Sequence, residues 1–308
     1  MLAVLLAACN QSARPTATAT AGGLSCRLPV SISDPKGGSS TGAFVSFPSG
    51  QVTVDPSGTG RTFYDRPLSR WLPASPNAVS ADGTSYAYVD FKVPGTAQQQ
   101  HLHLIDLSSG RERVFLLAHA DDPSAYTIVD YAPEGIWLTF SGYEGPSGGL
   151  FFLDLTTGVF KDAGILDLTA PIAGSQGVFW FTDPGPNPQM GGGIGYVIQS
   201  RVLRLTVSDR KREVWLSMPG YEVTVLGTDL AGHPIVRSWL DGGADEAIRL
   251  VLSPTKSKVI GVPQGNYQVM ADSHGLWFGG NQGLYHYSEA GGVKKVSSQL
   301  AYPAGACA

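Results

Sequence analysis

Two histidines two positions apart are the residues in this sequence whose side chains and spacing most suggest a metal site. His101 and His103 belong to the alternating segment HLHLIDL, so their side chains point to the same side of an extended chain. That spacing suits two ligands of a metal ion, but the sequence identifies no third ligand. The alternative is a solvated pair on a strand surface, which we adopt. We therefore assign no metal-ligating residue and expect no cofactor.

Carboxylates and serines are the other groups to consider. Acidic residues recur near turn-like positions, and a ring of them around a channel would suit calcium, although no DxDxDG loop is present. Ser147 lies in the segment SGYEGPSGG without the strand, turn and helix that surround a nucleophilic serine. We assign no catalytic residue from the sequence.

One insertion is more suggestive of binding than of catalysis. The segment DPGPNPQMGGGIG (183–195) is rich in Gly and Pro and longer than a hairpin needs, and such loops are often functional. Segments 90–100 and 142–149 are expected at the corresponding place in neighbouring repeats, so all three would share one face. The candidate binding residues on these loops are Asp183, Asn187, Gln189, Met190, Tyr143 and Glu144.

The elements that would position these loops follow from a repeat. Six segments begin with a glycine, continue as an aromatic alternating strand, and are followed by a strand, a tight turn and another strand. In the first unit this second part is the weaker segment 61–73. The glycines lie 41 to 55 residues apart, a period typical of propeller blades. They are Gly42, Gly83, Gly135, Gly177, Gly232 and Gly275.

Alternating strands without helical periodicity indicate an all-β fold. We predict a six-bladed β-propeller with four antiparallel strands in each blade. Seven blades are the alternative, if Cys26 to Ser46 forms a blade of its own. The segment CRLPVSI (26–32) precedes the first glycine, and we expect it to pair with the last blade and close the ring.

The cysteines fit this closure. Cys26 and Cys307 lie at the two ends of the predicted propeller, and ring closure would bring them together. We predict a disulfide between them, which would constrain the unfolded chain by up to roughly 5 kcal/mol. The alternative is two free thiols.

Composition limits the class of partner. The chain has 308 residues, a net charge of −4, 10% aromatic and 15% charged residues. The most basic stretch, DRKREVW (209–215), is interpreted as a solvated hairpin, so we expect no nucleic-acid partner.

The N-terminus indicates a location. Met1–Ala8 are all apolar but too few to span a bilayer. Leu6-Ala7-Ala8-Cys9 resembles the lipobox of bacterial lipoproteins, which implies cleavage before Cys9 and lipid attachment to its thiol. No Lys or Arg precedes the run, which suggests that the true start lies upstream.

The chain accordingly divides into three parts. Residues 1–8 are a signal-peptide remnant, 9–25 a lipidated cysteine with a flexible tether, and 26–308 the propeller. We expect an extracytoplasmic protein, lipid-anchored to the bacterial cell membrane.

Two blades carry a family resemblance. The stretch SADGTSYAYVDF…HLHLIDLSSGRERVF resembles the TolB-type, WD40-like propeller repeat, and the third blade keeps part of the same pattern. The resemblance implies that Asp106 and Asp154 have a structural role in turns. The matching residues are Ser80, Asp82, Gly83, Ala87, Tyr88, Asp106 and Gly110, with Asp154, Thr157 and Gly158 in the third blade.

The whole chain resembles a bacterial lipoprotein with such a propeller, which implies a binding role at the cell surface or in the periplasm. We therefore expect a binding or scaffold module for a protein, peptide or glycan ligand. The alternative is a propeller hydrolase or lyase acting on glycans or peptides at the mouth of the channel, which would need titratable groups converging there.

Overall fold

The computed structural model describes residues 23–33, 40–90, 99–117, 125–141, 149–166, 169–175, 177–186, 189, 197–240 and 243–308. Within these ranges the regular structure consists of 25 β-strands and two short 3-10 turns, η1 (Pro56–Gly58) and η2 (Pro76–Ala78). Cys9, Asn187, Met190, Tyr143, Glu144 and Ser147 lie outside the described residues.

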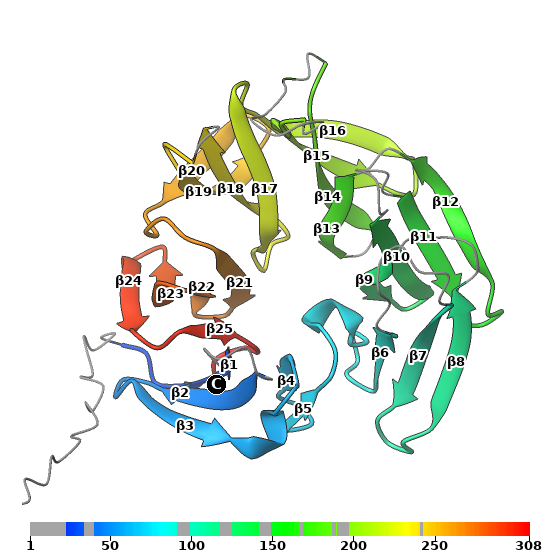
Figure 1. Ribbon diagram of the computed structural model, residues 1–308, viewed down its shortest axis with the longest axis horizontal. Helices are drawn as coiled ribbons and strands as arrows, with labels where there is room; N and C mark the ends of the chain where they lie inside the picture. The colour runs from blue at the N-terminus through cyan, green and yellow to red at the C-terminus, as the bar shows by residue number, and fades with distance from the viewer. Residues whose placement is uncertain are drawn as a thin grey trace, which may run out of the picture.

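Six antiparallel sheets stand around a central opening as the blades of a propeller (Figure 1). From the centre outward, the first blade is β25 (Ala301–Pro303), β1 (Arg27–Ile32), β2 (Thr41–Ser46) and β3 (Gln51–Asp55). The second is β6 (Ser85–Val89), β7 (Gln100–Asp106) and β8 (Glu112–Leu117). The third is β9 (Ala125–Ala132), β10 (Gly135–Ser141), β11 (Gly149–Asp154) and β12 (Phe160–Leu166).

The remaining blades follow in chain order around the ring (Figure 1). The fourth is β13 (Thr169–Ser175), β14 (Val178–Asp183), β15 (Arg201–Thr206) and β16 (Lys211–Ser217). The fifth is β17 (Tyr221–Thr228), β18 (Pro234–Leu240), β19 (Ala247–Ser253) and β20 (Lys256–Ile260). The sixth is β21 (Tyr267–Asp272), β22 (Gly275–Gly280), β23 (Gly283–Ser288) and β24 (Gly292–Ser297).

The six-bladed all-β prediction is confirmed, and two details of the repeat differ from expectation. The second blade has three strands, and its innermost position is represented by one bridge between Val79 and Tyr86. Segment 61–73, expected to complete the first unit, forms a separate hairpin of β4 (Phe63–Asp65) and β5 (Arg70–Leu72). The seven-bladed alternative is wrong, because Cys26 to Ser46 belongs to the first blade.

The six glycine-led strands are not all equivalent. Five of them are second strands from the centre, but Gly42 lies in β2, the third strand of its sheet. The second strand of the first blade is β1, which has no leading glycine. The spacing was misleading here, because the first blade takes its innermost strand from the other end of the chain.

The C-terminal strand closes the ring by joining the first blade. The N-terminal strand was expected to join the last blade; instead β25, from the C-terminus, pairs antiparallel with β1 and completes the first blade. The predicted disulfide is confirmed: Cys26 and Cys307 are bonded, with their Cα atoms 5.5 Å apart. Both side chains are buried in a cluster that also contains Trp277 of the sixth blade.

Packing between neighbouring blades forms the core. Leu102 of β7 and Ile136 of β10 lie in one buried cluster between the second and third blades. Ile235 of β18 and Phe278 of β22 lie in another between the fifth and sixth. Each alternating strand therefore buries apolar side chains against the next blade, as the repeat predicted.

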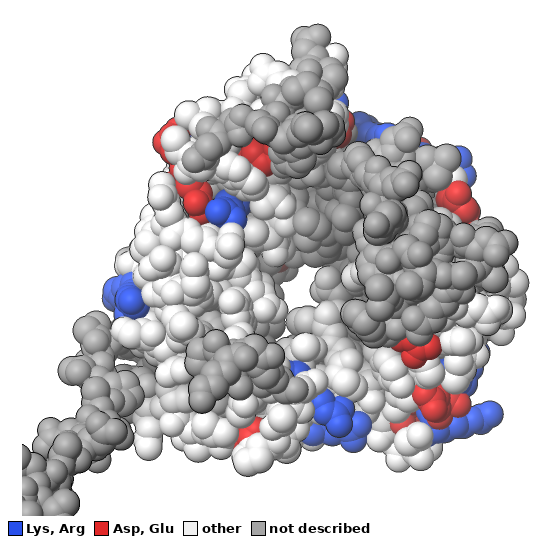
Figure 2. Space-filling view, viewed as in Figure 1, with Lys and Arg blue, Asp and Glu red and all other residues white. Residues whose placement is uncertain are grey.

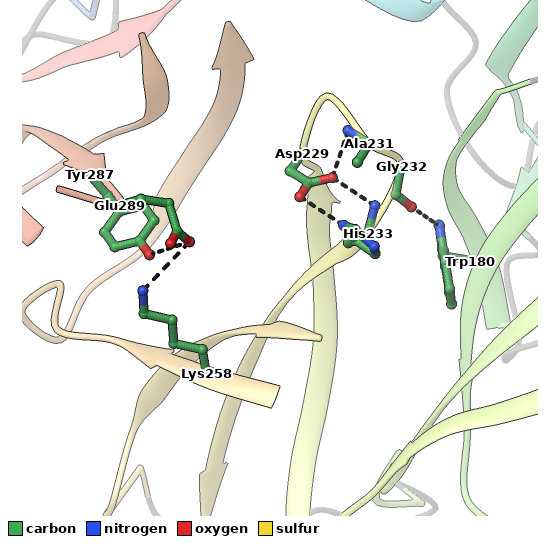
Figure 3. A network of polar contacts seen from close by, with 8 residues as sticks. All are labelled: Trp180, Asp229, Ala231, Gly232, His233, Lys258, Tyr287 and Glu289. Carbon is green, nitrogen blue, oxygen red and sulfur yellow. Dashed lines mark hydrogen bonds and ion pairs between the residues drawn. The ribbon is translucent and has the colours of Figure 1, made fainter. Parts of the chain in front are cut away.

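Polar contacts also join the blades. Trp180 of the fourth blade donates its indole N–H to the carbonyl oxygen of Gly232 in the fifth, at 3.0 Å (Figure 3). The turn that presents this carbonyl is held by Asp229, which accepts the backbone N–H groups of Ala231 and His233 at 2.9 and 2.8 Å. A buried indole thus obtains a partner from the adjacent blade.

Gly275 shows why a leading glycine is needed. Its φ is +135°, and an added Cβ would lie 2.1 Å from the carbonyl oxygen of Tyr287 on β23. We expect Gly275→Ala to lower the free energy of unfolding by about 3 kcal/mol, from backbone strain and overpacking together. Chemical denaturation followed by tryptophan fluorescence measures this loss.

Gly83 supplies the matched control. Its φ is +67° but a Cβ there meets no atom within 4 Å, so Gly83→Ala should cost only about 1 kcal/mol. Equal losses for the two variants would show that the close approach of β23 to Gly275 adds nothing to the loss of unfolding free energy.

Candidate functional site

The connections between second and third strands of all blades emerge on one face of the disc. The innermost strands β9, β13, β17, β21 and β25 contact one another in that order around the opening. Each of β13, β17, β21 and β25 follows the outermost strand of the preceding blade after a short connection, so all five run in the same direction. Because each sheet is antiparallel, its connection between second and third strands leaves from the face where the innermost strand begins. We call this the loop-bearing face. The strand ends that flank segments 90–100, 142–149 and 183–200 all lie on it.

The base of the insertion in the fourth blade is tightly held. Asp183 ends β14 and Arg201 begins β15, and they are register partners. The guanidinium of Arg201 donates two hydrogen bonds to the two oxygens of Asp183, both at 2.6 Å, and the Gly185 N–H donates to the same carboxylate at 2.9 Å. The hydrogen bonds to Asp183 raise the pKa of Arg201, so the guanidinium keeps its charge beside the carboxylate.

A pocket of about 250 Å³ opens beside this ion pair. Apolar side chains line part of it and polar groups the remainder. Two backbone hydrogen bonds fix its edges, from Ile198 N–H to the Gln189 carbonyl at 2.9 Å and from Met218 N–H to the Ser200 carbonyl at 2.8 Å. The lining residues are Pro184, Gly185, Pro186, Gln189, Ile198, Ser200, Arg201, Ser217, Pro219 and Gly220.

The structure brings together part of the set that the sequence proposed. Gln189 lines the pocket, and Asp183 holds the Arg201 side chain that lines it. Arg201, Ile198 and the Ser217–Gly220 connection were missed, because they follow the insertion or lie in the next connection. The strand register could have indicated Arg201, since the residues flanking a hairpin insertion face each other.

A second polar cluster surrounds the two histidines of β7. His101 Nδ1 lies 3.0 Å from one oxygen of Asp90, and His103 Nε2 lies 2.8 Å from the other. His103 Nδ1 lies 2.6 Å from Glu112 on β8, and its ring stacks on that of Tyr88, with ring centroids 4.6 Å apart. Burial raises the pKa of the Tyr88 hydroxyl, with the charge of Glu112 acting in the same direction.

The cluster corrects the interpretation of a simply solvated pair. The side chains of His101 and His103 are 37% and 17% exposed, and each faces a carboxylate. A carboxylate that orients an imidazole is an arrangement suited to proton transfer. No group of three or more His, Cys, Asp or Glu side chains in the described ranges is arranged to hold a metal ion.

The turn acids have the structural role that the resemblance implied. Asp106 accepts the Ser108 hydroxyl at 2.7 Å and the Ser109 backbone N–H at 2.8 Å, and Asp154 accepts two backbone N–H groups in the same way. The Ser108 hydrogen bond is the main cause that lowers the pKa of Asp106 to about 2. The contribution of Asp106 to stability is therefore present above the pKa of an unfolded aspartate and is lost as the pH falls toward 2.

The mouth of the channel carries few charges. A pocket of about 260 Å³ lies at the inner edge of the second blade, and every residue lining it is uncharged, including Ala87, Tyr88, Val89 and Tyr126. Figure 2 shows that acidic and basic side chains of the described residues lie mainly toward the perimeter of this face rather than around the central opening. The described residues thus bring no carboxylate pair to this pocket.

Comparison with known proteins shows the fold and no closer relationship. No family model matches the chain, and no curated protein does. Oligogalacturonate lyase in complex with manganese is 15% identical over 84% of this chain and 70% of that chain, with a TM-score of 0.53. TolB from Acinetobacter baumannii is 14% identical over 93% of this chain and 68% of that chain, with a TM-score of 0.48.

A third solved structure also has this architecture in part. The β-propeller domain of the Trilobed protease from Pyrococcus furiosus is 9% identical over 91% of this chain and 85% of that chain, with a TM-score of 0.47. At these identities the likeness concerns the fold alone, and we base the propeller assignment on the coordinates and on the first structure. Among the described residues, no helix has the length and apolar character needed to cross a bilayer.

Proposed function

We propose that this protein is a lipid-anchored, extracytoplasmic binding or scaffold module that holds a protein, peptide or glycan ligand on its loop-bearing face. The pocket beside the Asp183–Arg201 ion pair is the observation that carries this proposal. Its walls come from two separate connections of the fourth blade, held in place by backbone hydrogen bonds. Such a preorganised, mostly apolar hollow with a few fixed polar groups is typical of ligand sites.

The contrast between the two faces supports this choice of surface. On the opposite face the connections are tight turns, and carboxylates such as Asp106 and Asp154 use their oxygens to cap the turn backbone. On the loop-bearing face the connections between second and third strands are longer in every blade except the sixth, and strand ends of the second and fourth blades surround open pockets. Binding residues commonly lie on loops carried by a rigid scaffold.

Cross-linking in intact cells tests the binding surface. A photoreactive benzoylphenylalanine at Ser217, which lines the pocket and is exposed, should form discrete adducts. The matched control is the same residue at Ala290, which is equally small and exposed but lies in a tight turn of the opposite face. We expect several-fold more adduct at Ser217 because a bound ligand excludes water there; equal yields, or none at either position, contradict the proposal.

The anchor rests on Cys9, within the segment Leu6-Ala7-Ala8-Cys9. The disulfide between Cys26 and Cys307 is consistent with an oxidising, extracytoplasmic compartment. A diacylglyceryl thiol at Cys9 would hold the propeller at the membrane, because paired acyl chains give stable anchoring.

Cys9→Ser should move at least 90% of the protein from the membrane to the soluble fraction after a wash in about 0.5 M salt, since the acyl chains supply most of the binding. Cys26→Ser, which removes a different cysteine, should stay in the membrane fraction. Immunoblots of the two fractions measure the change, and retention of the Cys9→Ser variant would refute the anchor.

A propeller hydrolase or lyase is the second candidate, and the histidine cluster is the observation that favours it. Asp90 forms a hydrogen bond with His101, and Glu112 forms one with His103. The cluster would have to support turnover of a glycan or peptide substrate. Loss of such turnover in His101→Gln, with binding at the Ser217 pocket preserved, would favour the enzyme over the binding module.

A further inference from the structure

Four lysines gather on the outer edge of two adjacent blades. Lys256 and Lys258 lie in β20, the outermost strand of the fifth blade, and Lys294 and Lys295 lie in β24, the outermost strand of the sixth. All four side chains are exposed. We call this set the lysine rim.

Lysines from both blades approach the same junction. Lys258 Nζ lies 5.2 Å from the centre of the Tyr287 ring, and Lys295 Nζ lies 5.8 Å from the centre of the Tyr285 ring (Figure 3 shows Lys258 and Tyr287). Both tyrosines are buried in the cluster between the fifth and sixth blades. The two ammonium groups therefore border one apolar seam, from opposite sides.

The lysine rim has an excess of positive charge. Glu289 is the only acidic residue in segments 253–260 and 288–297; it lies 3.6 Å from Lys258 and is 82% exposed. On the fourth blade, by contrast, Lys211 lies 2.6 Å from Glu213, so that edge is largely neutralised. An edge with four lysines and one carboxylate keeps a net positive charge and attracts an anionic surface, and the attraction is screened by salt.

The chain toward the proposed lipid anchor leaves the propeller beside this edge. Leu24 and Cys26 pack in the cluster that contains Leu284 of β23 and Val296 of β24. Val296 directly follows Lys295, and Figure 1 shows the N-terminal end of the described chain close to the sixth blade. Gly23 is fourteen positions after Cys9. Fourteen residues span at most about 50 Å when fully extended, so the lysine rim would stay within that distance of an anchor at Cys9.

We propose that the lysine rim docks on an anionic phospholipid bilayer and holds the disc on its edge. The proposal rests on the lipid anchor proposed above, which would keep this edge close to the membrane. The lysine ammonium groups would contact lipid phosphates. Because these groups already lie at the surface, the contact would not disturb the packing of Tyr285 and Tyr287 beneath them. Docking by an outer edge keeps the loop-bearing face free for its ligand.

Vesicle co-sedimentation of the full chain carrying Cys9→Ser tests the rim without the acyl chains. The probes are vesicles of phosphatidylcholine alone and of phosphatidylcholine with 30% phosphatidylglycerol. We expect at least tenfold stronger partitioning onto the anionic vesicles in 50 mM salt, because each lysine at such a surface contributes about fivefold. Raising the salt to 500 mM should abolish the difference.

The rim variant is Lys256→Gln, Lys258→Gln, Lys294→Gln and Lys295→Gln, and it should lose at least tenfold in partitioning. The matched control removes four cations from other blades: Arg111→Gln, Lys161→Gln, Arg210→Gln and Lys211→Gln. It has the same net charge and should lose less than threefold. Should the rim variant fail to fold, Lys294→Gln with Lys295→Gln should give an intermediate loss.

Equal losses in the rim and control variants would show that net charge alone acts, and would overturn the proposal. Equal binding to the two kinds of vesicle would overturn it as well. Neither result bears on the anchor, which the fractionation of Cys9→Ser measures separately at high salt.

Discussion

Replacement of both Cys26 and Cys307 with serine is expected to lower the free energy of unfolding by about 3–5 kcal/mol. The disulfide spans 281 positions, so it removes a large loop-closure entropy from the unfolded chain. It lies beside the contact of β25 with β1, where the ring has no covalent continuity. Differential scanning calorimetry should show a fall in Tm of about 5–10 °C.

Reductant provides the control for this loss. The wild-type protein should melt at the lower temperature after reduction in mild denaturant, while the doubly substituted protein should be insensitive to reductant. Cys9→Ser, which leaves the bridge intact, should melt like the wild type. Two free thiols detected in the oxidised wild-type protein would remove the basis of the prediction.

Asp272→Ala is expected to cost about 3–5 kcal/mol through loss of a buried acceptor. One oxygen of Asp272 accepts the Trp277 indole N–H at 2.7 Å and the Cys307 backbone N–H at 2.8 Å. The other oxygen accepts the His274 backbone N–H at 2.8 Å. Asp272 is 7% exposed, and alanine would leave the buried Trp277 and Cys307 donors and the half-buried His274 N–H without their acceptor. Urea unfolding followed by circular dichroism measures the loss.

Asp272→Asn separates the hydrogen bonds from simple packing. The amide has nearly the same shape and one acceptor oxygen, which can keep the bonds to Trp277 and Cys307 but not the one to His274. We expect about half of the alanine loss. An asparagine variant as unstable as the alanine variant would indicate that the charge, rather than the acceptor geometry, matters.

The two largest effects should be coupled. Cys307 forms the disulfide and also donates its N–H to Asp272, so both interactions hold the same C-terminal segment. Combining Asp272→Ala with the two serine substitutions should destabilise less than the sum of the separate losses, by at least about 0.5 kcal/mol. Strict additivity would mean that the segment stays in place without either interaction.

The pocket proposed to bind a ligand should not depend on the disulfide that closes the ring. The pocket beside Asp183 and Arg201 lies in the fourth blade, far along the chain from the closure in the first. Its walls are fixed by local hydrogen bonds within the fourth blade and to β17 of the fifth, neither of which takes part in the closure. We therefore expect ligand adducts at Ser217 to survive loss of the disulfide at temperatures below the lowered Tm.

The candidate site was only partly accessible from the sequence. Asp183 and Gln189 were identified because the insertion around them is visibly longer than a turn. Arg201 was missed because it is 18 positions from Asp183 and becomes its neighbour only through the antiparallel register of β14 and β15. The contacts of Asp90 and Glu112 with His103 also arise from strand pairing, because β7 lies between β6 and β8 in the sheet.

The sequence by itself determined the class of fold, the number of blades and the position of the insertion. Alternation and tight-turn residues such as Gly83 act over a few positions, so they are readable one segment at a time. Cys26 and Cys307 could be paired in advance because any closed ring brings its ends together.

Only the tertiary structure decided how the ring closes and which charges gather. The sequence did not show which end of the chain supplies the closing strand; in the structure it is the C-terminal strand β25, which pairs with β1. The lysine rim on β20 and β24 exists because two outer strands, separated in the sequence, lie on adjacent blades. Long-range pairing sets both features, and no local pattern encodes which distant segments will meet.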